Sequence, residues 1–180
     1  MTVLVGYASK YGATQGIAER IAATLVADGH DAQALPLASV ESTADYDAFV
    51  IGSAAYMGSW RKDATRFVRK HSSTLATSPV WLFSSGPLGT ATTDAHGRDV
   101  LTEAAPKQFA EFKESITPRA MQVFFGALDP AKLRRRDRLI RKMPAGHELL
   151  PEGDFRDWAA IQAWAERIAD ELARSTKGGA

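Results

Sequence analysis

The sequence has 180 residues, of which 45% are hydrophobic and 24% charged, and it contains no cysteine. This composition excludes a disordered or fibrous chain, and the lack of cysteine excludes disulfide bonds, thiolate metal sites and a cysteine nucleophile. The formal net charge is only +1, so the protein as a whole is neither strongly acidic nor strongly basic. We expect a single domain over residues 1–174, a frayed tail over residues 175–180, and a cytoplasmic location, since neither a leader nor a membrane-length apolar run is visible.

A strand and a helix joined by a short turn are the first predicted elements. Residues 2–8, TVLVGYA, are mostly apolar and carry no charge, which favours a strand covered on both faces. From Thr14 to about Asp28, apolar residues recur every three or four positions, and Gly29 follows. This spacing predicts an amphipathic helix with a glycine at its end.

Further strands and helices then alternate along the chain. We predict an edge strand, a short buried strand, a helix, two more strands and a closing helix, over residues 31–37, 47–53, 62–72, 79–86, 119–128 and 155–174. Such alternation is typical of a parallel sheet with helices on both faces. Five strands fit a doubly wound α/β sheet of order 2-1-3-4-5, in which ligands bind at the carboxyl ends of strands one and three.

The turn between the first strand and the first helix contains two hydroxyl residues. Ser9-Lys10-Tyr11-Gly12-Ala13-Thr14 brings them, with backbone N–H groups, to the positive end of a helix dipole, which favours an anion. The turn matches neither the nucleotide phosphate loop nor the dinucleotide fingerprint. Two interpretations stay open: the turn binds a phosphate monoester, or Ser9 or Thr14 merely caps the helix.

Two more loops of similar character follow the third and fourth strands. The segment GSAAYMGSWRKD places Tyr56 and Trp60 among small residues, and SSGPLGTATTDAHG is small and hydroxyl-rich. These loops suit a flat aromatic ligand, although Tyr56 and Trp60 could instead pack the loop onto the sheet. The four histidines lack the spacing of a metal-ligand set, and Asp94 with His96 is the one titratable pair in the second loop.

At these residues the chain resembles the flavodoxin-like family and, within it, the menaquinone-dependent protoporphyrinogen oxidase group. The first turn is similar to the flavodoxin phosphate motif [ST]-x-[ST]-G-[NQ]-T at Ser9, Gly12 and Thr14, while Tyr11 replaces a hydroxyl residue and Ala13 an amide. The segments similar to the oxidase group are YDAFVIGSAAYMGSWRKDATRFVRKH, FFGAL, RDRLIRKM and DFRDWAAIQAWAERIADEL. Together with the first turn they are spread along nearly the whole length of the chain.

The resemblance implies a flavodoxin-like three-layer fold and FMN as the cofactor. It implies a phosphate turn formed by Ser9, Lys10, Tyr11, Gly12, Ala13, Thr14 and Gln15, and a ring site formed by Ala54, Ala55, Tyr56, Met57, Gly58, Ser84, Ser85 and Gly86. No metal and no protein nucleophile is needed, because the flavin carries the redox chemistry, and no catalytic residue is assigned.

Three functions remain open on this resemblance. The first is an FMN oxidoreductase that oxidises protoporphyrinogen with a quinone acceptor. An electron-carrier flavodoxin is the second, and a flavin-binding or storage protein without turnover is the third. A phosphorylated receiver domain is rejected, because the ends of the first and third strands, YASK and GSAA, carry no carboxylate for Mg²⁺.

A strongly basic segment covers residues 132–142. KLRRRDRLIRK contains seven cations and one acid, a net charge of +6, at a place where the oxidase group has a more apolar insert. We consider a solvated helix that pairs with acidic surface or an acidic partner protein, and a peripheral contact with an anionic membrane or quinone. Nucleic acid is not expected, since no aromatic residues interleave the cations. A homodimer is also compatible with the sequence.

Overall fold

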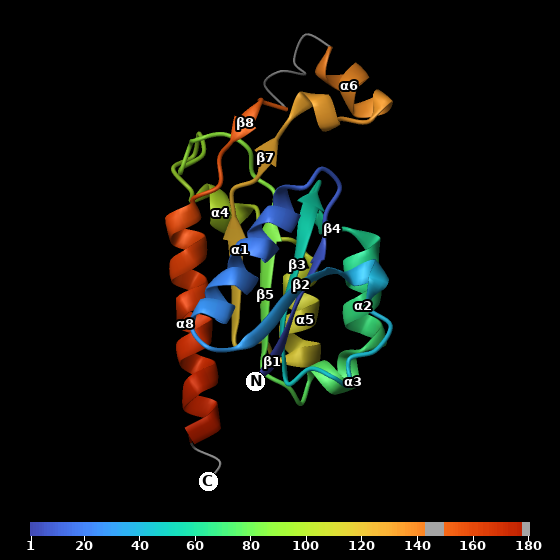
Figure 1. The fold of residues 1–180 in the computed structure, drawn as a ribbon. Helices are drawn as coiled ribbons and strands as arrows, with labels where there is room; N and C mark the ends of the chain where they lie inside the picture. The colour runs from blue at the N-terminus through green and yellow to red at the C-terminus, as the bar shows by residue number, and fades with distance from the viewer. Residues whose placement is uncertain (143–149, 178–180) are drawn as a thin grey trace.

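The computed structural model describes residues 1–142 and 150–177, and the structural statements below concern those residues. Five parallel strands form the centre of the molecule (Figure 1). They are β1 (Thr2–Ala8), β2 (Asp31–Pro36), β3 (Ala48–Tyr56), β5 (Val80–Ser85) and β6 (Ala120–Phe124). Their order, β2-β1-β3-β5-β6, confirms the predicted doubly wound sheet of order 2-1-3-4-5.

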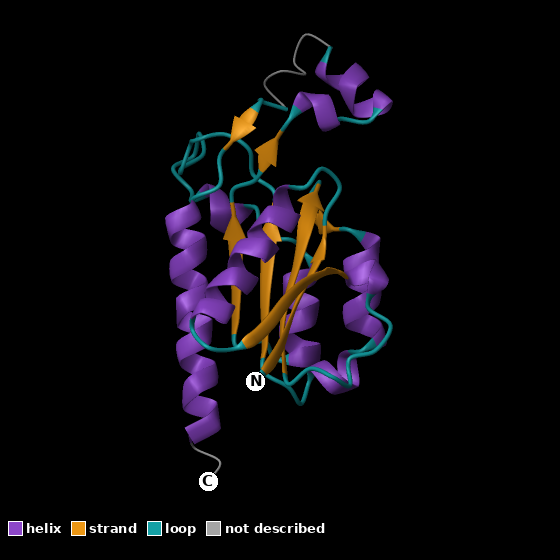
Figure 2. Cartoon of the chain, in the orientation of Figure 1, coloured by secondary structure: helices purple, strands orange, loops and turns teal. Residues whose placement is uncertain are grey.

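Helices cover both faces of the sheet and give three layers (Figure 2). One face packs against α1 (Ala13–Ala27) and α8 (Trp158–Lys177); the other packs against α2 (Lys62–Lys70), α3 (Ser72–Leu75) and α5 (Gln108–Ile116). Side chains alternate along β1, so that Val3 and Val5 join the first core and Leu4 the second. Two separate apolar cores therefore hold the sheet rigidly beneath its carboxyl ends.

A small outlying layer lies beyond the carboxyl ends of the strands. There β7 (Ala127–Leu128) pairs antiparallel with β8 (Gly153–Asp154), and α6 (Arg135–Arg141) projects above the sheet (Figure 1). The remaining elements are the 3-10 turns η1 (Leu37–Ser39) and η2 (Pro130–Lys132), strand β4 (Ser59–Trp60) and helix α4 (Val100–Glu103). None of the described helices is long and apolar enough to cross a membrane.

The third main strand is longer than the sequence predicts. We expected it to end at Ser53 and to be followed by a loop, but β3 continues to Tyr56 and pairs antiparallel with β4. Met57 and Gly58 form the connection with φ values of 50° and 67°. Two successive left-handed residues make a tight two-residue hairpin turn. Residues 54–56 are therefore strand and residues 57–58 a hairpin tip, rather than an irregular loop.

The last predicted strand is in fact two strands. Residues 119–128 were expected to be continuous, but β6 ends at Phe124 and β7 begins at Ala127. The N–H of Gly126 donates to the carbonyl oxygen of Pro87 at 2.8 Å, which turns the chain out of the sheet. This break directs the following residues over the strand ends.

Two helix predictions also need correction. The closing helix begins at Trp158 rather than residue 155, because the Asp157 carboxylate accepts the N–H of Ala160 at 2.9 Å and so caps its start. It continues to Lys177, into the tail that was expected to fray, while residues 178–180 lie outside the described residues. Helix α5 was not predicted, although Phe109, Phe112 and Ile116 form its buried face.

Candidate functional site

A cavity of about 530 Å³ opens at the carboxyl ends of β1, β3 and β5. The sequence analysis predicted most of its lining, namely Ser9, Lys10, Tyr11, Ala13, Thr14, Ala54, Ala55, Tyr56, Met57, Ser85 and Gly86. The cavity is mostly apolar, and its polar groups gather at the start of α1. Its size and character are those of a small-molecule site.

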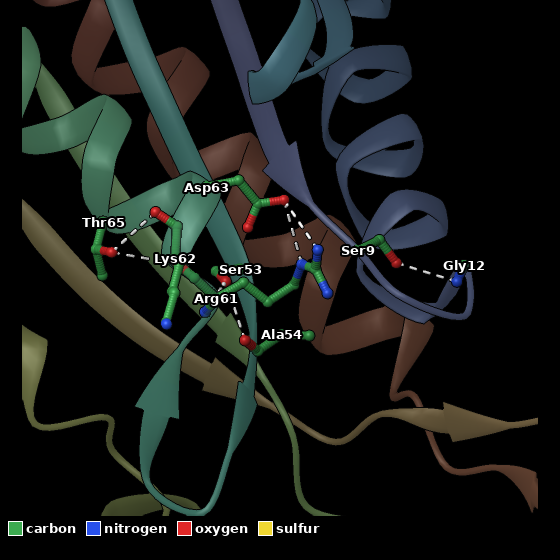
Figure 3. Close-up of polar contacts among 8 residues, drawn as sticks. All are labelled: Ser9, Gly12, Ser53, Ala54, Arg61, Lys62, Asp63 and Thr65. Atoms are coloured by element: carbon green, nitrogen blue, oxygen red, sulfur yellow. Dashed lines mark hydrogen bonds and ion pairs between the residues drawn. The ribbon is translucent and has the colours of Figure 1, made fainter. Parts of the chain in front are cut away.

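The opening turn presents free backbone donors at one end of this cavity. Gly12 precedes α1 with a φ of 91°, and no described side chain caps the helix. The Ser9 hydroxyl instead accepts the N–H of Gly12 at 3.0 Å and so orders the turn (Figure 3). The alternative that Ser9 or Thr14 merely caps the helix is therefore wrong. The N–H groups of the first helical turn stay available for an anion.

Thr14 carries a polar atom that the rest of the described protein does not satisfy. The residue is fully buried, yet its hydroxyl oxygen has no hydrogen-bond partner among the described residues. Buried hydroxyls are nearly always paired, so an orphan of this kind calls for an explanation. Thr14 also lines the cavity. Its hydroxyl is available to a ligand that enters there.

The hairpin on the other side of the cavity is fixed by a buried serine. The Ser53 hydroxyl accepts the N–H of Arg61 at 3.1 Å and donates to the carbonyl oxygen of Ala54 at 2.9 Å (Figure 3). Trp60 is buried against Phe109 and Phe112, with ring centroids 5.6 Å apart in both pairs. Trp60 therefore packs the hairpin onto the domain and does not reach the cavity.

Tyr56 behaves differently from Trp60. Its side chain is 44% exposed and lines the cavity, and the Lys10 ammonium lies 5.5 Å from its ring centroid. Because Tyr56 contributes little to the core, the packing explanation does not hold for it. Its ring is free to contact a flat ligand.

The basic segment closes the cavity from above through its single acid. Asp137, on α6, accepts hydrogen bonds from the Lys10 ammonium at 2.5 Å and from the Tyr11 hydroxyl. The bonds from Lys10 and then Tyr11 lower the pKa of Asp137. Burial acts to lower the pKa of Lys10, but its bonds to Asp137 and Tyr11 outweigh this and raise it. Tyr11, which departs from the phosphate motif, therefore anchors α6.

Arg156 supports the opening turn from outside. Its guanidinium donates to the carbonyl oxygen of Ala13 at 3.3 Å, is held by Asp154 at 2.7 Å, and lies 4.3 Å from the Trp158 ring centroid. A Cβ atom at Gly16 would lie 2.6 Å from this guanidinium, so glycine leaves room for it. Sequence reasoning missed Arg156, because its turn partner lies 143 positions away.

Four predicted residues do not line the cavity. Gly12 and Gln15 border a smaller cavity of about 310 Å³ on the other side of the turn. Ser84 is fully buried, and its hydroxyl donates to the carbonyl oxygen of Ser53 at 3.5 Å. Gly58 lies at the hairpin tip, where its carbonyl oxygen accepts the N–H of Lys107. The wall residues that sequence reasoning missed are Leu88, Gly126, Ala127, Leu128, Leu133, Asp137, Ile140 and Leu150.

The pair Asp94 and His96 lies outside the cavity lining. The Asp94 carboxylate accepts the backbone N–H groups of Arg98 and His96 at 2.9 and 2.8 Å, and it forms an ion pair with the Arg98 side chain at 2.7 Å. The backbone bond from Arg98 is the main reason why the pKa of Asp94 is lowered. The His96 side chain is largely exposed. These contacts order the loop itself.

Comparisons with known proteins agree with this geometry. The family model described as "Flavodoxin domain" matches residues 4–148. The structure is similar to a cysteine-to-serine mutant of flavodoxin from Pseudomonas aeruginosa, with 17% identity, a TM-score of 0.60, and coverage of 96% of this chain and 99% of that one. A flavodoxin from the domain Archaea gives 16% identity, a TM-score of 0.60 and the same coverage.

Among the similar structures are larger proteins, of which this chain covers only a part. Rubredoxin oxygen:oxidoreductase from Desulfovibrio gigas matches with 13% identity and a TM-score of 0.63, over 99% of this chain but 37% of that one. No curated protein matches the sequence.

The comparisons settle the family but not the finer group. At these identities the similar structures show the fold alone, and the resemblance to the protoporphyrinogen oxidase group gains no support from them. The family model, by contrast, covers most of the chain and includes the opening turn, the β3–β4 hairpin and α6. The chain therefore belongs to the flavodoxin domain family.

Proposed function

We propose that the protein binds FMN in the cavity at the carboxyl ends of β1, β3 and β5 and acts as an electron carrier. The observation that carries this proposal is Thr14, whose buried hydroxyl has no partner among the described residues and lies beside an uncapped helix start. A phosphate group accepts hydrogen bonds from both kinds of donor. The Lys10 ammonium lies beside the same turn, where it is paired with Asp137.

The remaining walls suit a flat aromatic ring. Small residues at Ala54, Ala55 and Gly86 leave room on one side, and Leu128 and Leu133 form an apolar surface on the other. A ring in this position excludes water and contacts Tyr56. Bound FMN supplies the electron-transfer chemistry, and the chain supplies binding, orientation and electrostatics.

The carrier function is preferred to an enzyme because of the family match. The matching model and two of the similar structures described above are named for flavodoxin.

Oxidation of protoporphyrinogen with a quinone acceptor is a second candidate, favoured by one observation. A cationic hollow of about 430 Å³, formed by Lys10, Arg134, Arg135, Arg136 and Asp137, adjoins the apolar cavity. Such a hollow would attract the propionate groups of a porphyrinogen.

Titration of the purified, flavin-free protein with FMN and with riboflavin tests the main proposal. Flavin fluorescence should be quenched at one equivalent of FMN, and riboflavin should bind more weakly because it lacks the phosphate. Equal affinity for the two flavins would show that the opening turn does not bind the phosphate. If neither flavin binds, the proposal is wrong. Turnover of the FMN-loaded protein with protoporphyrinogen and a menaquinone analogue then decides the second candidate.

A further inference from the structure

Exposed apolar side chains gather at the mouth of the cavity. Of the five large hydrophobic residues that are exposed in the described structure, four belong to the β3–β4 hairpin or to α6. Tyr56 and Met57 come from the hairpin, and Leu139 and Ile140 from α6. Tyr56, Met57 and Ile140 line the same cavity, and Leu139 is the exposed neighbour of Ile140 on α6. We call these four residues, together with Arg134, Arg135 and Arg136, the docking face.

Met57 occupies an unfavourable position for a residue of its kind. It is fully exposed and has a φ of 50°, in a tight turn where asparagine, aspartate or glycine fits best. A long apolar side chain held in water and in left-handed backbone costs conformational and hydration free energy. Neither cost is recovered inside the described structure, so the side chain is suited to contact something outside it.

The arginines of the docking face are not neutralised by the described structure. Arg135 and Arg136 are exposed and form no ion pair with any described residue. The single acid of the basic segment, Asp137, is turned inward to Lys10 and Tyr11. The contact with Asp137 holds α6 against the domain and leaves its outer surface cationic. A rigid cationic surface around an apolar centre has the composition of a protein interface.

Building on the proposed function, we propose that the docking face binds an acidic partner protein at the mouth of the flavin cavity. Charge complementarity identifies the partner as acidic, and the apolar centre requires a matching apolar surface on it. A protein fits better than a bilayer, since α6 has seven residues and its apolar side chains are divided from Met57 by the cavity mouth. Helices that lie in a membrane surface present a longer continuous apolar face.

Binding of the flavin-free and FMN-loaded chain to two probe proteins tests the docking face. The probes are a plant-type ferredoxin, which is strongly acidic, and cytochrome c, which is strongly basic; affinity is measured by calorimetry at low and high salt. The variant Arg135→Glu with Arg136→Glu should weaken ferredoxin binding at low salt by on the order of tenfold or more. Leu139→Gln should weaken it at both salt concentrations, because its effect is not electrostatic.

A matched control changes the net charge by the same amount elsewhere. Arg66→Glu with Lys113→Glu alters exposed residues of α2 and α5 that form no ion pair with the described residues. This control should change ferredoxin binding by less than about twofold, since it lies away from the steering surface. Equal effects of the two double variants, or tighter binding of cytochrome c than of ferredoxin, would overturn the docking face.

Two further results distinguish binding of a partner protein from binding of a membrane, and the docking face from the proposed FMN function. The first is that the chain does not bind ferredoxin but binds vesicles of anionic phosphatidylglycerol, and that Arg135→Glu with Arg136→Glu abolishes the vesicle binding. This result would show that the docking face binds a membrane and not a partner protein. Calorimetry with the flavin-free chain needs no cofactor and therefore tests the docking face independently of FMN binding. The proposed function is tested by FMN titration alone.

Discussion

The Lys10 ammonium and the Asp137 carboxylate meet at 2.5 Å and join the opening turn to α6, although 127 positions separate them in the sequence. Only about a quarter of either side chain is exposed, so water screens this ion pair less than a surface pair. The pair makes the cover of the cavity depend on the same turn that is proposed to hold phosphate. Five predictions follow from this pair, from the contacts around the opening turn and from the packing of the sheet beneath it.

Asp137→Asn should loosen α6. At pH 7 hydrogen exchange of the α6 amides should become roughly fivefold faster, the equivalent of about 1 kcal/mol for a partly exposed ion pair. Asp170→Asn, which breaks the exposed Asp170–Arg174 pair on α8, is the matched control and should leave α6 unchanged. Unaltered exchange in Asp137→Asn would mean that α6 is held by its apolar contacts alone.

The pH dependence of this contact follows from the two pKa shifts. Asp137 has a pKa below its ordinary value of 3.8, so its contribution is complete above pH 3.8 and is lost as the pH falls through the lowered pKa. Lys10 has a pKa above its ordinary value of 10.5, so its contribution is complete below pH 10.5 and is lost above the raised pKa. Exchange of α6, corrected for intrinsic rates, should be slowest between these limits, and Asp137→Asn should remove the acid limb.

Thr14→Val should have opposite effects on the empty and the loaded protein. Removing a buried hydroxyl that lacks a partner should leave the flavin-free protein equally stable or up to about 1 kcal/mol more stable. FMN affinity should fall by about 1.5–3 kcal/mol, roughly 10- to 150-fold, because a bond to a charged group is lost. Urea unfolding and FMN titration measure the two effects. Unchanged FMN affinity would show that Thr14 does not bind the phosphate.

Arg156→Gln should affect FMN more than riboflavin. The guanidinium holds the carbonyl oxygen of Ala13, so its loss should misplace the N–H groups that are proposed to face the phosphate. FMN affinity should fall on the order of tenfold, the value of one strong hydrogen bond, and riboflavin affinity should stay the same. Arg167→Gln, on the exposed side of α8, is the control. An equal loss for both flavins would assign Arg156 a purely structural role.

Gly52→Ala should be strongly destabilising although the change is small. Gly52 is opposite Phe83 in the β3–β5 pair, and an added Cβ would clash with the Phe83 ring, which is fully buried. Overpacking of this kind typically costs about 1–3 kcal/mol, and the close approach to a buried ring places this variant at the upper end. Gly86→Ala meets its nearest neighbour at 3.5 Å, an ordinary contact, and should cost less than about 1 kcal/mol. Urea unfolding of both variants makes the comparison.

Local patterns predicted the framework because burial repeats with the period of each element. The apolar stripe of α1 and the uncharged run of β1 are visible in the sequence, and their order predicts where the cavity lies. The spacing of Phe109, Phe112 and Ile116 is the signal in the sequence that could have predicted α5. These signals depend only on neighbouring residues.

The cover of the cavity could not be predicted in the same way. Asp137 lies in a segment of cations, and nothing local indicates that it reaches Lys10 and Tyr11. The role of Arg156 depends equally on a distant partner, and the end of β6 depends on the contact between Gly126 and Pro87. Such features are determined by tertiary contacts, which the periodicity of the sequence does not reveal.

Parallel pairing has a further consequence for how the sheet assembles. Val3 pairs with Ala48, Phe49 with Val80, and Trp81 with Ala120, so every neighbouring pair of main strands closes a loop of about thirty residues or more. Apart from the small β3–β4 hairpin, the sheet has no local nucleus. The entropy of loop closure must be lost before most contacts form, so refolding should be slow, and a severed half should not fold alone.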